Sequence, residues 1–148
     1  MHTPELVTIR TAALGDVEAL VALFAQLGYP VDGEGLESRL RRLLSESPLD
    51  AVYVASVSGQ VAGVVVVHVE PMLHQECPLG RITALVVDAS HRQLGVGRKL
   101  VAAAERFLHA AGCARVEVTS AEHRGDAHRF YVGLGFREKR IRFVKDRH

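Results

Sequence analysis

The segment from residue 81 to residue 120 constrains the fold most strongly, because it has the pattern of two strands joined through a long helix. Residues 81–88 (RITALVVD) have the composition of a strand buried on both faces, and residues 114–120 (ARVEVTS) alternate like a second strand. Between them, apolar side chains recur at helical spacing over residues 94–111. A strand, a crossover helix and a second strand form a right-handed parallel unit, so this segment predicts an α/β fold.

The preceding segments predict antiparallel strands and two more helices. Two β-branched runs within residues 50–70 flank Ser58-Gly59, a pair that suits a tight hairpin turn. Asp16 is expected to cap a helix that ends at Gly28. We therefore expect a single mixed α/β sheet with about four helices. The other expected elements are a strand over residues 6–10, helices over residues 31–47 and 126–134, and a last strand over residues 141–145.

Composition and charge argue against several classes of protein. With 148 residues, of which 48% are hydrophobic and 24% charged, the chain suits one soluble domain that spans residues 1–148. A formal net charge of +1 gives no reason to expect a nucleic-acid or membrane-surface partner. The N-terminal segment lacks the pattern of a signal peptide, and the two cysteines form no disulfide framework. We therefore expect a cytoplasmic protein.

The segment of residues 90–100 (SHRQLGVGRKL) is the first candidate functional site. Gly95 and Gly97 stand where a helix is expected to begin, and the first turn of a helix offers unpaired backbone N–H groups to an anion. Three basic side chains add positive charge: Arg92, Arg98 and Lys99. A dinucleotide fingerprint would need a third glycine where this chain has Leu100. An anion site and an ordinary strand-to-helix turn with a solvated basic rim both remain open.

Two motifs in the second half together resemble the signatures of the GNAT family of N-acetyltransferases. Arg92-x-x-Gly95-x-Gly97 resembles the first signature, and residues 127–136 (AHRFYVGLGF) resemble the second. The resemblance covers residues 81–145, and it extends to the first half through the order of elements. It implies acetyl-CoA as the donor and a sheet whose central strands, residues 81–87 and 114–120, splay apart.

The same resemblance implies where acetyl-CoA binds. The pantetheine arm would lie in the splay and pair with the backbone like an extra strand, while the pyrophosphate would rest on the amides of residues 93–98. A backbone N–H near Val86–Val87 would polarise the thioester carbonyl. The implied cofactor-binding residues are Leu85, Val86, Val87, Arg92, Gln93, Leu94, Gly95, Val96, Gly97, Arg98, Arg124 and Tyr131. Arg124 stands where many members of the family carry an asparagine, a position that Ser120 or Asp126 could serve instead.

The resemblance also implies catalytic roles. Tyr131 falls on the tyrosine that protonates the departing thiolate; the alternative is a tyrosine that packs a short helix onto the sheet. The base is less well defined, because the family often places a glutamate on this strand, whereas residues 81–87 include Arg81 and Thr83 and no carboxylate. Glu70, His74 and Glu76 are the candidate bases, and deprotonation by ordered water is an equal alternative.

A metal site is not expected. His68, His74 and Cys77 contain suitable ligand atoms, but their spacing matches no structural zinc pattern. Strand alternation is expected to point His68 away from the other two.

The acceptor is predicted from a finer resemblance to the aminoalkylphosphonate acetyltransferase branch of the family. It rests on the stretches LVVD, DAHRFY and RFVK, and it implies a small anionic primary amine that attacks the thioester directly in a ternary complex. Three arginines are candidates to bind the anion: Arg81, Arg124 and Arg129. Two alternatives are an enzyme that acetylates protein N-termini or lysines, and a non-catalytic CoA-binding module. A homodimer is possible for each.

Overall fold

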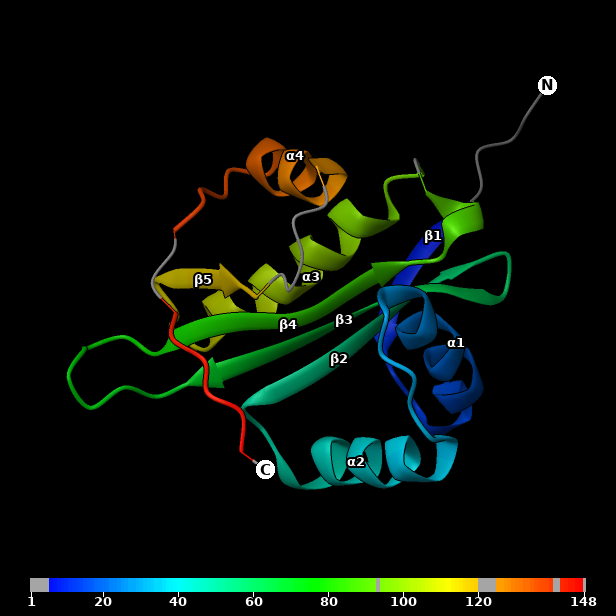
Figure 1. The fold of residues 1–148 in the computed structure, drawn as a ribbon, viewed down its shortest axis with the longest axis horizontal. Coiled ribbons are helices and arrows are strands. Elements are labelled where there is room, and N and C mark those ends of the chain that lie inside the picture. The colour runs from blue at the N-terminus through cyan, green and yellow to red at the C-terminus, as the bar shows by residue number, and fades with distance from the viewer. Residues whose placement is uncertain (1–5, 93, 120–124, 140–141, 148) are drawn as a thin grey trace.

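One five-stranded sheet organises the chain, in the order β1-β2-β3-β4-β5 (Figure 1). The computed structural model describes residues 6–92, 94–119, 125–139 and 142–147. The strands are β1 (Val7–Thr11), β2 (Asp50–Val57), β3 (Gln60–Glu70), β4 (Leu79–Val87) and β5 (Arg115–Val118). Neighbouring strands are antiparallel except β4 and β5, which are parallel. The mixed α/β sheet expected from the sequence is therefore confirmed.

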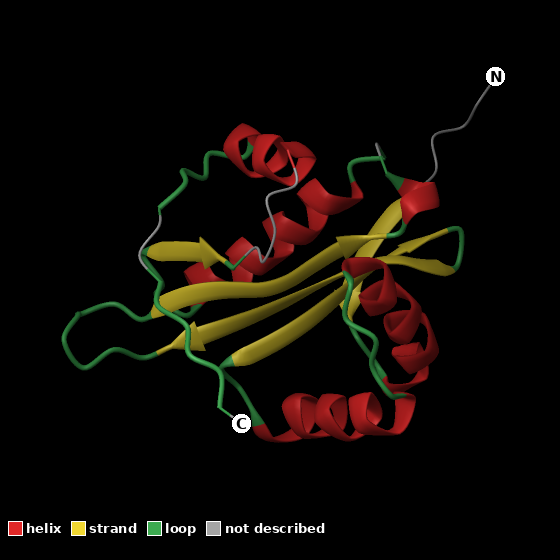
Figure 2. Ribbon diagram, in the orientation of Figure 1, coloured by secondary structure: helices red, strands yellow, loops and turns green. Residues whose placement is uncertain are grey.

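Helices cover both faces of the sheet (Figure 2). The α-helices are α1 (Val17–Leu27), α2 (Gly33–Glu46), α3 (Val96–Ala110) and α4 (Gly125–Gly133). Two short 3₁₀ helices, η1 (Leu14–Asp16) and η2 (Ala89–His91), precede α1 and follow β4. None of the helices in the described ranges has the length and apolarity needed to cross a membrane.

Alternation along β3 divides the core into two layers. Val65 and Val67 point to the face covered by α3, where they pack with Leu100 and Leu108. Val64 points to the opposite face, where α1 and α2 supply leucines. Those leucines are Leu20, Leu23, Leu36 and Leu40. The sheet is therefore buried on both sides, which explains the long β-branched runs of β2 and β3.

The hairpin turn is confirmed as the sequence predicts. Ser58 and Gly59 connect β2 and β3 with φ angles of 51° and 78°. Positive φ at both central residues is the geometry of the tight turns that match the twist of the two strands. The turn fixes the register of β2 on β3, and that register later decides which side chains meet at the site.

Asp16 is the N-cap residue of α1 and Gly28 its C-cap, as expected, but the Asp16 side chain makes no cap hydrogen bond to α1. Its carboxylate instead accepts two hydrogen bonds from Arg10, at 2.7 and 2.8 Å, and one from the backbone N–H of Ala13. The expectation of a last strand is wrong. Among the residues expected to form a last strand, 142–145 adopt no strand, and Phe143 is 99% exposed. Its neighbour Val144 is also exposed, at 77%, so neither of the apolar side chains described in this segment is buried against the sheet.

Candidate active site

The two central strands separate halfway along β4. β5 pairs with β4 only from Leu79 to Ile82, and the last contact is the N–H of Thr119 donating to the carbonyl of Ile82 at 3.1 Å. From Thr83 to Val87, no strand in the described part of the chain lies on that edge of β4. The free edge leaves backbone donors and acceptors available to an extended ligand, as in peptide recognition by strand addition. The splay that the sequence predicts is therefore present.

A β-bulge marks the point of separation. Val66 lies opposite Ala84 and Val67 lies opposite Ile82, so Thr83 is the extra residue on β4. Bulges bend a strand and redirect a side chain, and they are common beside active sites. Thr83 is exposed at the first position of the free edge.

Three expected cofactor-binding residues lie on the free half of β4, but their side chains belong to the core. Leu85 and Val87 pack against the cluster under α3, and Val86 packs on the side of α1 and α2. Val86 is buried and the other two are partly buried, so the hydrogen-bonding groups of this segment are those of its main chain.

The turn after β4 is held by Asp88. Its carboxylate accepts hydrogen bonds from Gln26 Nε2 at 2.7 Å, His91 Nδ1 at 2.9 Å and the backbone N–H of Ser90 at 3.2 Å. These hydrogen bonds, with that from the Ser90 hydroxyl first among them, hold the pKa of Asp88 well below its usual range. Gln26 also accepts from the backbone N–H of Ala89 at 3.1 Å, so α1 fixes the turn from the other side.

No side chain in the described ranges caps the N-terminus of α3. Gly95 occupies the cap position in the left-handed region (φ 76°), no described side chain accepts a hydrogen bond from the first turn, and that turn holds no acidic residue. By contrast, Asp32 caps α2 by accepting from the backbone N–H of Gly35 at 3.0 Å. The amides of Val96, Gly97 and Arg98 are thus free to bind an anion. Gln93 lies outside the described residues.

Gly97 has a packing role that the sequence does not reveal. A Cβ atom at this position would lie 3.1 Å from Cζ of Phe130 and 3.6 Å from Cγ2 of Val87. The absence of a side chain at Gly97 therefore lets Phe130 of α4 pack on the first turn of α3. It also leaves the amide of Gly97 open to a ligand. Arg92, Leu94 and Arg98, the other expected residues of the turn, are exposed.

Tyr131 lies in the last turn of α4, within a group of three aromatic side chains. Its ring makes edge contacts with Phe130 and Phe136, at centroid distances of 5.2 and 5.7 Å. Burial raises the pKa of Tyr131, which keeps the phenol protonated at neutral pH. Phe130 contacts Gly97, so the tyrosine is anchored beside the uncapped end of α3. Arg124 and Ser120 lie outside the described residues, and Asp126 pairs with Arg129 at 2.8 Å on the surface.

The expected bases lie at the paired end of β4. Glu70 stands opposite Leu79, and its carboxylate lies 3.1 Å from Nε of Arg81. Arg81 also reaches Glu117 of β5 at 3.7 Å; its buried Nε–H is not aligned for a hydrogen bond with any described residue. His74 is exposed in the connector that enters β4 at Leu79, whereas the glycine turn follows the opposite end of the strand.

A chain of three hydrogen-bonded side chains was not predicted. His68 of β3 places Nδ1 2.5 Å from the carboxylate of Asp50 and Nε2 2.8 Å from the hydroxyl of Thr83. Ser47 donates a further hydrogen bond to Asp50. The Asp50–His68 pair follows from the register of β2 on β3, so alternation within the predicted hairpin could have revealed it. The contact with Thr83 depends on the bulge, which the sequence does not show.

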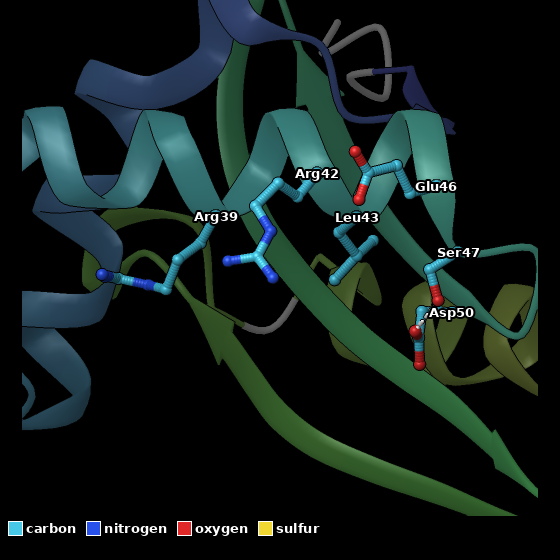
Figure 3. A pocket seen from close by; sticks show the side chains of 6 residues that line it. All are labelled: Arg39, Arg42, Leu43, Glu46, Ser47 and Asp50. Carbon is cyan, nitrogen blue, oxygen red and sulfur yellow. Dashed lines mark hydrogen bonds between the residues drawn. The ribbon is translucent and has the colours of Figure 1, made fainter.

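An open cavity of about 330 Å³ lies between α2 and the start of β2. Figure 3 shows Arg39, Arg42 and Leu43 on one side of α2, with Ser47 and Asp50 where the chain leaves the helix. Glu46 completes the lining. The cavity thus has two guanidinium groups on one wall, and the carboxylate that binds His68 at one end.

Comparison with known proteins agrees with this geometry. The chain is 30% identical over 142 residues to an aminoalkylphosphonate N-acetyltransferase of Salmonella typhimurium, covering 93% of this chain and 89% of that protein. An aminoglycoside N-acetyltransferase, AAC(6')-Iy, solved in complex with CoA, has a TM-score of 0.85 at 20% identity, covering 100% of this chain and 99% of that one. Glucosamine-6-phosphate N-acetyltransferase from Arabidopsis thaliana has a TM-score of 0.82 at 23% identity, covering 96% and 99%.

A family model gives the same assignment. The model of the acetyltransferase (GNAT) family matches residues 17–136, which include β2, β3, β4, the glycine turn and α4. The matched range contains both signature motifs identified in the sequence. The chain belongs to the GNAT family of acetyltransferases.

Proposed function

We propose that this protein, as one domain over residues 1–148, transfers the acetyl group of acetyl-CoA to a primary amine of a small anionic molecule. The observation that supports this most is the meeting of two unpartnered features: the free edge of β4 and the uncapped N-terminus of α3. The first suits an extended amide-bearing arm, and the second suits a pyrophosphate. The amine attacks directly in a ternary complex.

The residues present fit acetyl-CoA. The backbone of Leu85, Val86 and Val87 offers main-chain partners along the free edge, while the side chains stay in the core. The amides of the turn over residues 93–98 hold the pyrophosphate, and the exposed Arg92, Arg98 and Lys99 add positive charge. When bound, acetyl-CoA supplies an acetyl group activated as a thioester.

Tyr131 holds the proton that the leaving sulfur needs. Its raised pKa keeps the hydroxyl protonated, so it donates a proton rather than accepting one at neutral pH. A main-chain N–H of Val86 or Val87 polarises the carbonyl from the free edge of β4.

The anionic character of the acceptor is supported by the relative that acts on aminoalkylphosphonates and by the arginines of the cavity. Arg39 and Arg42 stand on one wall, where planar guanidinium groups suit an oxyanion. Arg81 is less suited to bind the anion than the sequence suggests, because it already lies between Glu70 and Glu117. The proposal places the protein in the cytoplasm, needs no metal and no nucleic acid, and allows a homodimer.

An assay of thiol release from acetyl-CoA tests the proposal. We expect release with aminomethylphosphonate and 2-aminoethylphosphonate, and much slower release with ethanolamine, which keeps the amine and lacks the anion. Release with peptides alone would assign the protein acetyltransferase alternative. Binding of acetyl-CoA with no release on any amine would assign the non-catalytic module.

A further inference from the structure

We propose that Asp50, His68 and Thr83 form a relay that removes the proton from the acceptor amine. The proposal deepens the proposed acetyl transfer and rests on it. It replaces the bases expected from the sequence, among them Glu70 and His74, with a group formed from three strands. Thr83 touches the amine, His68 receives the proton through Thr83, and Asp50 is a positioning residue.

The hydrogen bonds select one tautomer of the neutral imidazole. A carboxylate accepts and does not donate, so the contact between Asp50 and Nδ1 of His68 places a proton on Nδ1. In the neutral ring, Nε2 is then the acceptor, and the Thr83 hydroxyl at 2.8 Å donates to it. The remaining lone pairs of the Thr83 oxygen are available to accept from an amine.

The position of the relay matches the proposed reaction. Thr83 is the bulge residue at the first position of the free edge of β4, where the proposed donor arm begins. The residue is exposed, whereas the side chains of His68 and Asp50 are only 27% and 24% exposed. Asp50 also lines the arginine cavity, so that cavity lies at the far end of the relay from Thr83.

The proton step balances without another reactant. As the amine nitrogen bonds to the acetyl carbon, one N–H bond breaks and its proton moves to the oxygen of Thr83. The proton already on that oxygen moves to Nε2 of His68, so Thr83 ends unchanged and His68 becomes an imidazolium. The carboxylate of Asp50 stabilises that cation at 2.5 Å, and the proton later leaves to solvent.

The positive charge nearest to His68 along the sheet is paired with carboxylates. Arg81 of β4 lies directly opposite His68 in register, but its guanidinium is near two carboxylates, those of Glu70 on β3 and Glu117 on β5. From α2, the cavity presents Arg39, Arg42 and Glu46 beyond Asp50. Asp50 is the carboxylate in contact with the imidazole, so it is the group that holds a positive charge there.

The first experiment measures kcat/KM against pH for thiol release with 2-aminoethylphosphonate, together with the Kd of acetyl-CoA. We expect His68→Asn to lower kcat/KM by about 100-fold and to remove the acidic limb of the profile, with an unchanged Kd. Asp50→Asn should lower the plateau and move the acidic limb. His109→Gln, an exposed histidine at the end of α3, is the matched control and should leave the profile unchanged.

A second pair of variants keeps the test valid if loss of His68 unfolds the protein. Thr83→Val removes the hydroxyl at nearly constant shape and should lower kcat/KM by at least about tenfold, whereas Thr83→Ser should restore most of it. Thr8→Val, at an exposed position of β1, is the control for the loss of a strand hydroxyl.

Each outcome decides between the two proposals. Equal activity of Thr83→Val and Thr83→Ser, or an acidic limb that survives in folded His68→Asn, would overturn the relay while acetyl transfer stands. A wild-type protein that binds acetyl-CoA but releases no thiol with any amine would overturn the proposed function, and the relay with it.

Discussion

The two halves of β4 have the same neighbour on one side and different surroundings on the other. From Leu79 to Ile82 the strand is paired with both β3 and β5, and a Cβ at Gly80 would lie 2.6 Å from Leu108. From Thr83 to Val87 no strand in the described ranges pairs with the β5 side of β4, and the strand leads into the turn held by Asp88. We call Leu79–Ile82, which is paired on both sides, the closed half of β4. We call Thr83–Val87, which is left available to a ligand, the open half.

The largest expected effect is the loss of kcat when Tyr131, the proposed proton donor, is replaced. Tyr131→Phe should lower kcat by about 100-fold, because the departing thiolate loses its proton donor, and leave the Kd of acetyl-CoA unchanged. Burial raises the pKa of Tyr131, so the wild-type rate should hold through neutral pH and fall only under alkaline conditions. The variant should lack that alkaline limb. Full turnover by the variant at saturating substrate would remove Tyr131 from the mechanism.

Gly80→Ala tests the closed half. The added Cβ would overlap the Leu108 side chain, so we expect a loss of about 1–3 kcal/mol in the free energy of unfolding, measured with urea. The folded fraction should keep its kcat, because Gly80 lies away from the free edge. A stable variant with reduced kcat would show that the two halves are not separate in function.

Asp88→Asn tests the end of the open half. The variant weakens the hydrogen bonds that hold the turn, so we expect the Kd of acetyl-CoA to rise by about tenfold, or ~1.4 kcal/mol. The folded-state pKa of Asp88 is lowered, so the stability it contributes is present above the ordinary carboxyl pKa and is lost as pH falls through the folded pKa. Acid unfolding followed by circular dichroism should therefore be less steep in the variant. An unchanged Kd would show that the turn needs no such support.

The smallest effect is expected at the ion pairs of the closed half. Glu70→Gln leaves Arg81 near Glu117, and partly exposed pairs contribute only about 0–1 kcal/mol. We expect kcat/KM to change less than about twofold, given that scale. A loss comparable to that of His68→Asn would restore Glu70 as the base.

Much of this comparison was visible in the sequence, because it depends on local patterns. β-branched runs around Ser58-Gly59 predict the hairpin, and the glycine turn with its following apolar stripe predicts the strand-to-helix unit. The motif at residues 127–136 predicts the place of Tyr131 on a short helix. These features are set by residues close together in the chain.

The parts that were missed depend on contacts between distant residues. The bulge at Thr83 is a property of the pairing of two strands, and without it His68 and Thr83 are not expected to meet. The packing of Phe130 on Gly97 joins α4 to α3, so the sequence shows only a glycine near a helix start. The last strand was predicted from the β-branched and aromatic residues of 141–145, but those described are exposed without a partner strand in the described ranges.

Amide hydrogen exchange with and without acetyl-CoA tests the division of β4 most directly. Binding should slow exchange at the amides of Thr83–Val87 that are not bonded to β3, and at Val96, Gly97 and Arg98. The amides of Leu79–Ile82 should be unchanged, because β3 and β5 already occupy both edges. Protection confined to the closed half, or absent from both segments at saturating acetyl-CoA, would contradict the assignment of the open half as the donor site.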